Sequence, residues 1–181
     1  SLVGSEMCIR DSQQVQQLNT FLNAYHRLTH LPDPVKTKVE IYALFDKLDR
    51  LLNSEQGSEN IRYISPKNME ILLDPNLITL ALINLIRNSL QATAHNPEPQ
   101  IQVEAGRNAT SLFIQVTDNG EGIPENRLED VFIPFYSTKK EGSGIGLPLS
   151  RRIMQLHGGE LNVNSVPREK TVFRMTFPEH L

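Results

Sequence analysis

The chain has 181 residues, of which 39% are hydrophobic, and this allows one domain of ordinary size with a short appendage. Its formal net charge of -3 provides no general attraction for nucleic acid or anionic lipid, so nucleic-acid binding is not expected. A single cysteine excludes a disulfide framework and a cysteine-based zinc site. Neither a signal peptide nor an apolar run of membrane-spanning length is evident, and we therefore expect a cytoplasmic chain.

The first fifty residues divide into a leader and two helices. Residues 1–12 join no periodic pattern and resemble translated sequencing-adapter read-through, so we expect a non-native or disordered leader; a frayed native tail is the alternative. Helical apolar spacing predicts an amphipathic helix over residues 13–31 and a second over 41–52. The first helix is either half of a dimer hairpin or a loose appendage. We expect a domain boundary after residue 52, with the main domain over 53–181.

The main domain alternates helical and strand patterns. Asp74-Pro75 is a strong helix start, with an N-cap followed by proline in the first turn. One layer of helices against one face of a mixed sheet is the economical architecture. The expected elements are strands over 60–65 and 69–73, a helix over 74–95, a hairpin of strands over 100–105 and 111–117, a short helix near 125–131, a helix after the glycines at 142–146, and strands over 160–166 and 171–177.

Three glycines at alternate positions, Gly142, Gly144 and Gly146, precede the last predicted helix. A glycine turn that opens a helix directs unpaired N–H groups and the positive end of the helix dipole at one point, which suits a phosphate. The alternative is a flexible connection with no ligand.

Two asparagines, Asn84 and Asn88, stand four residues apart on the helix that Asp74 opens. They share one face, and asparagine is a mediocre helix former, so the pair indicates a polar cleft. The Asn88 carbonyl oxygen can complete the shell of a Mg²⁺ ion that otherwise keeps waters and phosphate oxygens. A solvated helix face is the alternative.

Two loops complete the pattern. In Asp118-Asn119-Gly120-Glu121-Gly122, a carboxylate at a strand end can accept a hydrogen bond from an exocyclic amine, while the glycines let a flat ring approach the backbone. A tight turn is the alternative. The segment 132–140 places aromatic residues beside hydroxyls and Lys139, which is typical either of a lid over a phosphate or of an exposed loop with an apolar anchor.

The order of these pieces resembles the ATP-binding domain of sensor histidine kinases. This domain is part of the wider ATPase family that also holds gyrase, heat-shock chaperones and mismatch-repair ATPases. The match covers about residues 61–178. The resemblance implies an α+β fold: a two-layer α/β sandwich of the Bergerat type, with a mixed sheet of about five strands under three helices, preceded by an N-terminal helix. Residues 21–52 resemble the second hairpin helix and linker of nitrogen-regulation and dicarboxylate-sensor kinases.

The resemblance also implies a site for ATP and Mg²⁺. Asn88 would be the Mg²⁺ ligand with Asn84 beside it, Asp118 would bind the adenine amino group, and Lys139 would help the glycines hold the phosphates. A glycine usually precedes the family's final threonine, where this chain has Lys170. The implied nucleotide-binding set is Asn84, Asn88, Asp118, Gly120, Gly122, Ile123, Thr138, Lys139, Gly142, Gly144, Ile145, Gly146, Leu147 and Thr171.

Position 84 separates the branches of this family. Hydrolysing members have a glutamate there to activate water, whereas Asn84 cannot take a proton, so phosphoryl transfer to a protein histidine is favoured. His26 and His30 lack an acidic neighbour. We therefore expect the acceptor histidine on a dimerisation helix absent from this sequence.

The implied partners are that helix and the receiver domain of a response regulator. The parent would be a homodimer, either soluble or anchored in the inner membrane. The alternatives are a non-hydrolysing regulatory module (an anti-sigma serine kinase or a pseudokinase) and a gyrase-type ATPase.

Overall fold

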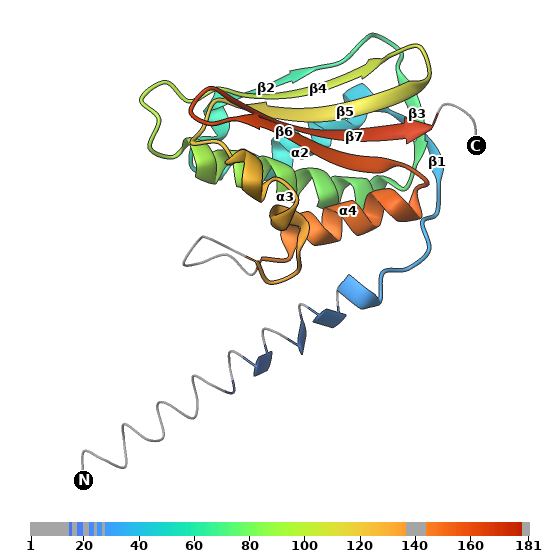
Figure 1. The fold of residues 1–181 in the computed structure, drawn as a ribbon. Helices are drawn as coiled ribbons and strands as arrows, with labels where there is room; N and C mark the ends of the chain where they lie inside the picture. Colours follow the sequence, from blue (N-terminus) through green and yellow to red (C-terminus); the bar gives the residue numbers. More distant parts are fainter. Residues whose placement is uncertain are drawn as a thin grey trace.

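The structure is a computed structural model that describes residues 28–136 and 144–178 together with residues 15, 18–19, 22–23 and 25–26. Each described position from 15 to 29 is helical, and this helix projects away from the folded domain (Figure 1). No helix in the described ranges is long and apolar enough to cross a membrane. The expected leader, residues 1–12, lies outside the described residues.

A five-stranded mixed sheet forms one layer of the domain, with the strand order β2-β4-β5-β7-β6. The β2–β4 pair is parallel and the other three pairs are antiparallel. The strands are β2 (Ile61–Ile64), β4 (Ile101–Arg107), β5 (Ser111–Asp118), β6 (Glu160–Val166) and β7 (Lys170–Pro178).

Three helices form the second layer and cover one face of the sheet: α2 (Ile41–Leu52), α3 (Pro75–Thr93) and α4 (Gly146–Leu156) (Figure 1). The strands alternate buried and less buried residues, as a sheet covered on one side requires. On its other face Gln115 donates to Glu104 at 2.8 Å and accepts from Arg174 at 2.9 Å. The two-layer α+β fold expected from the sequence is confirmed.

The start of α3 shows why the sequence folds as it does. Asp74 is the N-cap, and its Oδ1 accepts hydrogen bonds from the backbone N–H groups of Asn76 at 2.9 Å and Leu77 at 3.1 Å. Pro75 follows at the first helical position, where its missing N–H costs nothing. The helix then buries one face against the sheet and α4, so the position of its polar face is determined by this packing.

Two local expectations differ from the structure. A short strand that was not expected, β1 (Thr37–Glu40), pairs with β3 (Glu70–Leu73), so β3 lies in a separate two-stranded sheet. The segment 125–131 was expected to be one short helix, but it contains two 3₁₀ turns, Glu125–Arg127 and Asp130–Phe132. The first error arose because β1 is mostly exposed and its pairing partner is thirty residues away in sequence.

The helix α2 packs into the same core as the sheet. Its buried side chains are Ile41, Leu44, Phe45, Leu48 and Leu52, all of which are 3% exposed or less. The expected boundary after residue 52 stays a prediction, and this packing favours an earlier one. We propose that the folded domain begins near β1.

Candidate nucleotide-binding site

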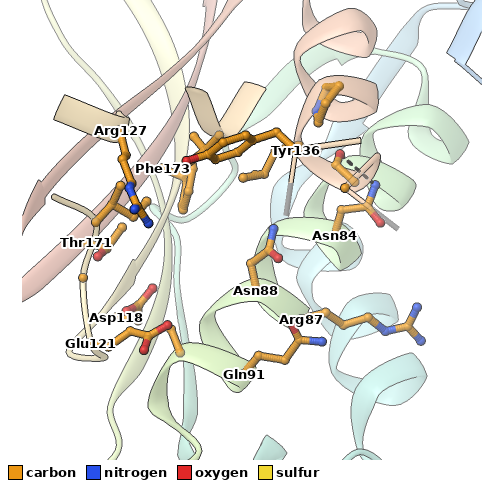
Figure 2. Close-up of a pocket in the computed structure, with 18 of the residues that line it drawn as sticks. Asn84, Arg87, Asn88, Gln91, Asp118, Glu121, Arg127, Tyr136, Thr171 and Phe173 are labelled. Carbon is orange, nitrogen blue, oxygen red and sulfur yellow. Dashed lines mark hydrogen bonds between the residues drawn. The ribbon is translucent and has the colours of Figure 1, made fainter. Parts of the chain in front are cut away.

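A cavity of about 380 Å³ lies between α3, the loop after β5, the start of α4 and the start of β7 (Figure 2). This volume is in the range of small-molecule sites, which are concave and combine apolar walls with a few placed polar groups. Its lining residues are Asn84, Arg87, Asn88, Gln91, Ala92, Asp118, Glu121, Gly122, Ile123, Pro124, Arg127, Val131, Tyr136, Gly144, Ile145, Gly146, Leu147, Pro148, Thr171 and Phe173.

One wall is the polar face of α3. Asn84, Asn88 and Gln91 are spaced by four and three residues, so they lie on one side of the helix and face the cavity (Figure 2). The Asn84 amide donates to the Gly146 carbonyl at 3.3 Å and thereby joins α3 to the start of α4. Within the described residues, the Asn88 amide has no hydrogen-bond partner, and it is therefore available to a ligand.

Asp118 is the last residue of β5 and lies at the end of the cavity away from the start of α4. Its side chain is buried, with 2% exposure. Its Oδ2 accepts a hydrogen bond from the Ser89 hydroxyl at 2.7 Å, and its Oδ1 accepts one from the Gly120 N–H at 3.0 Å. A carboxylate held on both oxygens has a fixed direction, which is what recognition of a particular amine requires.

The two glycines of the loop after β5 have different surroundings. Gly122 lines the cavity and has φ +77°, a conformation that favours glycine. Gly120 was also expected to line the nucleotide base, but it packs against the end of α3. The contact is close, since a Cβ at this position would lie 2.6 Å from the Ala92 carbonyl carbon. Gly120 therefore allows the loop to approach α3 closely, and its contribution to the cavity is the N–H that it donates to Asp118.

The opposite end of the cavity is the turn that opens α4. Gly144, Ile145, Gly146 and Leu147 line it, and among the described residues no side chain caps the first turn of the helix. The first N–H groups of a helix have no intrahelical partner, so these backbone donors suit an anion. The other residues expected here, Thr138, Lys139 and Gly142, lie outside the described residues.

The start of β7 supplies Thr171, which is 3% exposed and lies directly opposite Asp118 in the β5–β7 register. Its hydroxyl is 2.9 Å from the Ser165 Oγ. Lys170, which replaces the usual glycine, pairs with Val166 across the β6–β7 ladder. The structure therefore places Thr171 at the cavity with lysine at position 170.

Sequence reasoning missed several lining residues. Gln91 lies seven residues after Asn84, so the helical spacing alone would have found it. No local pattern distinguishes Arg127 or Tyr136, which approach the cavity from the segment after the loop (Figure 2). Arg87 lies at the rim, where its guanidinium binds Glu55 Oε1 at 2.6 Å.

His157 lies at the other end of α4, away from this cavity. It is 2% exposed, and its Nδ1 donates to the Ile153 carbonyl at 2.8 Å, which leaves Nε2 to accept from the Asp74 N–H at 3.0 Å. Burial lowers the pKa of the imidazole, assisted by the positive charge of Lys36, while the bond to Ile153 opposes the shift. His157 therefore joins the end of α4 to the start of α3 as a neutral side chain.

This geometry defines a class: an α+β sandwich that presents a buried carboxylate and a helix N-terminus at opposite ends of one cavity. Comparison with known proteins identifies the family. Residues 73–181 match the family described as histidine kinase-, DNA gyrase B-, and HSP90-like ATPases. The match covers more than half of the chain, which therefore belongs to this family.

The similar proteins are sensor kinases. The sensor histidine kinase ZraS of Escherichia coli strain K12 is 28% identical over 173 residues, which cover 94% of this chain and 37% of ZraS. The nucleotide-free catalytic domain of the histidine kinase ThkA superposes with a TM-score of 0.68 at 26% identity, over 80% of this chain and 95% of that chain.

A second ThkA structure, a complex with the response regulator protein TrrA, shares the fold with a TM-score of 0.73 at 23% identity, covering 93% of this chain and 49% of that chain. These findings confirm the expected resemblance to the ATP-binding domain of histidine kinases. The nitrogen-regulation and dicarboxylate-sensor subtype stays a prediction. The chain spans just over a third of the length of ZraS.

Proposed function

We propose that this chain is the catalytic part of a sensor histidine kinase, which binds Mg²⁺-ATP and transfers the γ-phosphate to a histidine on a dimerisation helix of the parent protein. The observation that carries this proposal is the single cavity lined by Asn88, Asp118 and the turn at Gly144–Leu147. These groups face one ligand-sized space from three separate elements.

The base end of the nucleotide would lie against Asp118. An adenine amino group donates hydrogen bonds, and the buried carboxylate of Asp118, oriented by Ser89 and Gly120, is an acceptor. Gly122 and Ile123 line the cavity beside Asp118, where the ring would lie against them, and Thr171 adds a hydroxyl. Guanine carries an oxygen in place of this amine, so the Asp118 carboxylate would favour adenine over guanine.

The phosphate end would lie against the start of α4, where the N–H groups of Gly144 to Leu147 are available. The side chains present fit Mg²⁺ through a single protein ligand, the Asn88 amide oxygen, which has no partner among the described residues. When bound, the ion would neutralise charge on the phosphates. Most of its ligands would be phosphate and water oxygens, since the described residues contain no group of three or more acidic, histidine or cysteine side chains that could hold a metal.

Asn84 supports transfer over hydrolysis. It faces the cavity and donates to the Gly146 carbonyl, and an amide cannot accept the proton of an attacking water. The site therefore positions the nucleotide and neutralises its charge, while the nucleophile comes from another protein segment.

That segment would be a dimerisation helix carrying the acceptor histidine, and the parent kinase would act as a homodimer. The phosphate would then pass to a response regulator, a step supported by the fold shared with ThkA, which has been seen in complex with the response regulator TrrA. The helix expected over residues 13–31 would be one half of the dimerisation hairpin.

The binding part of the proposal is tested by titrating the chain with ATP in the presence of Mg²⁺ and measuring heat. Asn88→Ala should reduce Mg²⁺-dependent affinity and Asp118→Asn should reduce adenine affinity, each by about tenfold, since bonds to charged groups contribute about 1.5–3 kcal/mol. Asn76→Ala is the matched control, because Asn76 is exposed on the same helix outside the cavity. Parent-like affinity in both site variants would contradict the proposal.

The transfer part is tested with γ-labelled ATP and the dimerisation domain of ZraS, supplied as a separate chain. We expect label on a histidine of that domain and none after Asn88→Ala. Steady ATP hydrolysis by the purified chain would instead favour a gyrase-type ATPase. ATP binding with neither transfer nor hydrolysis would favour the non-hydrolysing regulatory module.

A further inference from the structure

Three polar side chains form a row across neighbouring strands at the base end of the cavity. Asp118 on β5 lies directly opposite Thr171 on β7, and Thr171 lies directly opposite Ser165 on β6. In antiparallel pairs such directly opposed residues are close enough to interact. Asp118 and Thr171 line the cavity, whereas Ser165 stands behind Thr171, one strand further from it.

Ser165 makes two hydrogen bonds toward the cavity wall. Its Oγ accepts from the Ile123 backbone N–H at 2.9 Å and is 2.9 Å from the Thr171 Oγ1. A hydroxyl has one donor and two acceptor sites, so it can hold both groups at once. Ser165, which is half-buried, thereby connects the Ile123 backbone to the Thr171 hydroxyl, on either side of the place where the nucleotide base would lie.

The turn between β6 and β7 supports the same loop. The Arg168 N–H donates to the Glu121 carbonyl at 3.1 Å, and a Cβ on Gly122 would lie 2.6 Å from the Pro167 Cα. Together with the bond from Ile123 to Ser165, these contacts seat residues 121–123 on the β6–β7 turn. The loop that presents its backbone to the cavity is therefore held by a part of the chain that does not line it.

We propose that Ser165 is a positioning residue for recognition of the nucleotide base, acting through Ile123 and Thr171. The proposal rests on the function proposed above, since it assumes that the base lies against Asp118. With Ser165 in place, the ring is held so that its amine meets the Asp118 carboxylate. Without the Ser165 hydroxyl, the Ile123 N–H and the Thr171 hydroxyl lose a shared partner and the ring is held less firmly.

The test compares Ser165→Ala with the parent, using ATP and inosine triphosphate as probes in calorimetric titrations. Inosine carries a carbonyl oxygen in place of the adenine 6-amino group, so only ATP can donate a hydrogen bond to Asp118 through that exocyclic amine. We expect Ser165→Ala to weaken ATP binding about fivefold to tenfold, as for the loss of one part-buried hydrogen bond, and inosine triphosphate binding less than about twofold. Ser165→Thr, which keeps the hydroxyl, should restore most of the preference for ATP.

The matched control is Ser111→Ala. Ser111 is a buried serine whose hydroxyl donates to Asn108 Oδ1 at 2.8 Å in the hairpin turn at the other end of β5. This variant should keep the ATP preference even if it lowers thermal stability. If Ser165→Ala keeps the parent preference, or weakens both nucleotides by the same factor, the positioning role is overturned. A parent that binds neither nucleotide would instead overturn the proposed function, so the two failures are distinguishable.

Discussion

The backbone N–H of Phe135 donates to the Gly144 carbonyl at 2.9 Å, and both residues have left-handed backbones, with φ of +65° and +66°. A Cβ on Gly144 would lie 2.7 Å from the Phe135 carbonyl carbon. This hydrogen bond joins the end of the described segment 128–136 to the turn that opens α4. Only glycine fits at position 144, for reasons of both space and backbone conformation.

Gly144→Ala should therefore reduce both folding stability and nucleotide binding. We expect the free energy of unfolding to fall by about 2 kcal/mol, from left-handed strain and the clash with Phe135. ATP affinity should fall about tenfold, as one phosphate hydrogen bond is lost. Gly57→Ala is the control, since Gly57 has φ +89° but lies outside the cavity and meets only the flexible Leu90 side chain. An equal loss of ATP affinity in both variants would contradict the role given to Gly144.

Arg168→Gly should stabilise the protein. Arg168 has φ +63° in the β6–β7 turn, and left-handed strain of about 1–2 kcal/mol exceeds the extra unfolded-state entropy of glycine, about 0.5–1 kcal/mol. The net gain of up to about 1 kcal/mol would raise Tm by about 2–4 °C. Asn68→Gly, at φ +57°, should gain less because asparagine tolerates this conformation. A lower Tm for Arg168→Gly would show that the arginine side chain stabilises the turn.

His157 should make folding stability depend on pH in the range below neutrality. Burial lowers the pKa of His157 in the folded state, so the unfolded chain binds more protons as pH falls below the ordinary histidine value of about 6.5. The stabilisation is complete above that pH and is lost as pH falls toward the lower folded-state pKa. Unfolding free energies measured between pH 8 and 5 should fall less steeply for His157→Gln than for the parent.

The matched substitution elsewhere is His95→Gln, at an exposed position after the end of α3, and it controls for the effect of replacing a histidine by glutamine on overall stability. Asp74 contributes at lower pH: burial would raise the pKa of its carboxyl, but hydrogen bonds from Leu77, Val35 and Asn76 outweigh this and lower it. Its stabilisation is present above the unfolded-state value and is lost as pH falls through the folded-state pKa, below the histidine range.

Arg151→Ala should loosen the packing of the segment 129–132 against α4. The Arg151 guanidinium carbon lies 3.5 Å from the centre of the Phe132 ring, and one of its nitrogens is 3.6 Å from Glu129. We expect a loss of about 1 kcal/mol in unfolding free energy, mainly from the cation–π contact, since the exposed ion pair contributes little. Arg151→Lys should lose less, and Glu129→Gln should match the parent within error. Chemical denaturation of the three variants provides the comparison.

Local signals were sufficient for most of the fold. Asp74-Pro75 located the start of α3, and alternating residues on either side of the turn at 106–108 located the β4–β5 hairpin. The strand β1 escaped because four mostly exposed residues carry no periodic signal, and its pairing with β3 is a long-range contact. Sequence patterns report burial along one element, so strands defined only by a distant partner are missed.

The same limit applies to the candidate site, where residues placed by a local pattern were predicted and those placed by long-range contacts were not. Asn84, Asn88 and Asp118 were found because helix periodicity and strand ends place them without knowledge of the rest of the fold. Gly120 was expected to line the nucleotide base, whereas in the structure its lack of a side chain allows close contact with Ala92. Ser165 was not found, since its importance depends on a register shared by three strands.

The strand that carries Asp118 has a partner on each side, β4 and β7, and its carboxylate is already held on both oxygens. The base end of a bound nucleotide would therefore meet an acceptor whose direction is set before any ligand arrives. Adenosine alone should then bind with a measurable share of the affinity of ATP, because no reorganisation of this acceptor is needed.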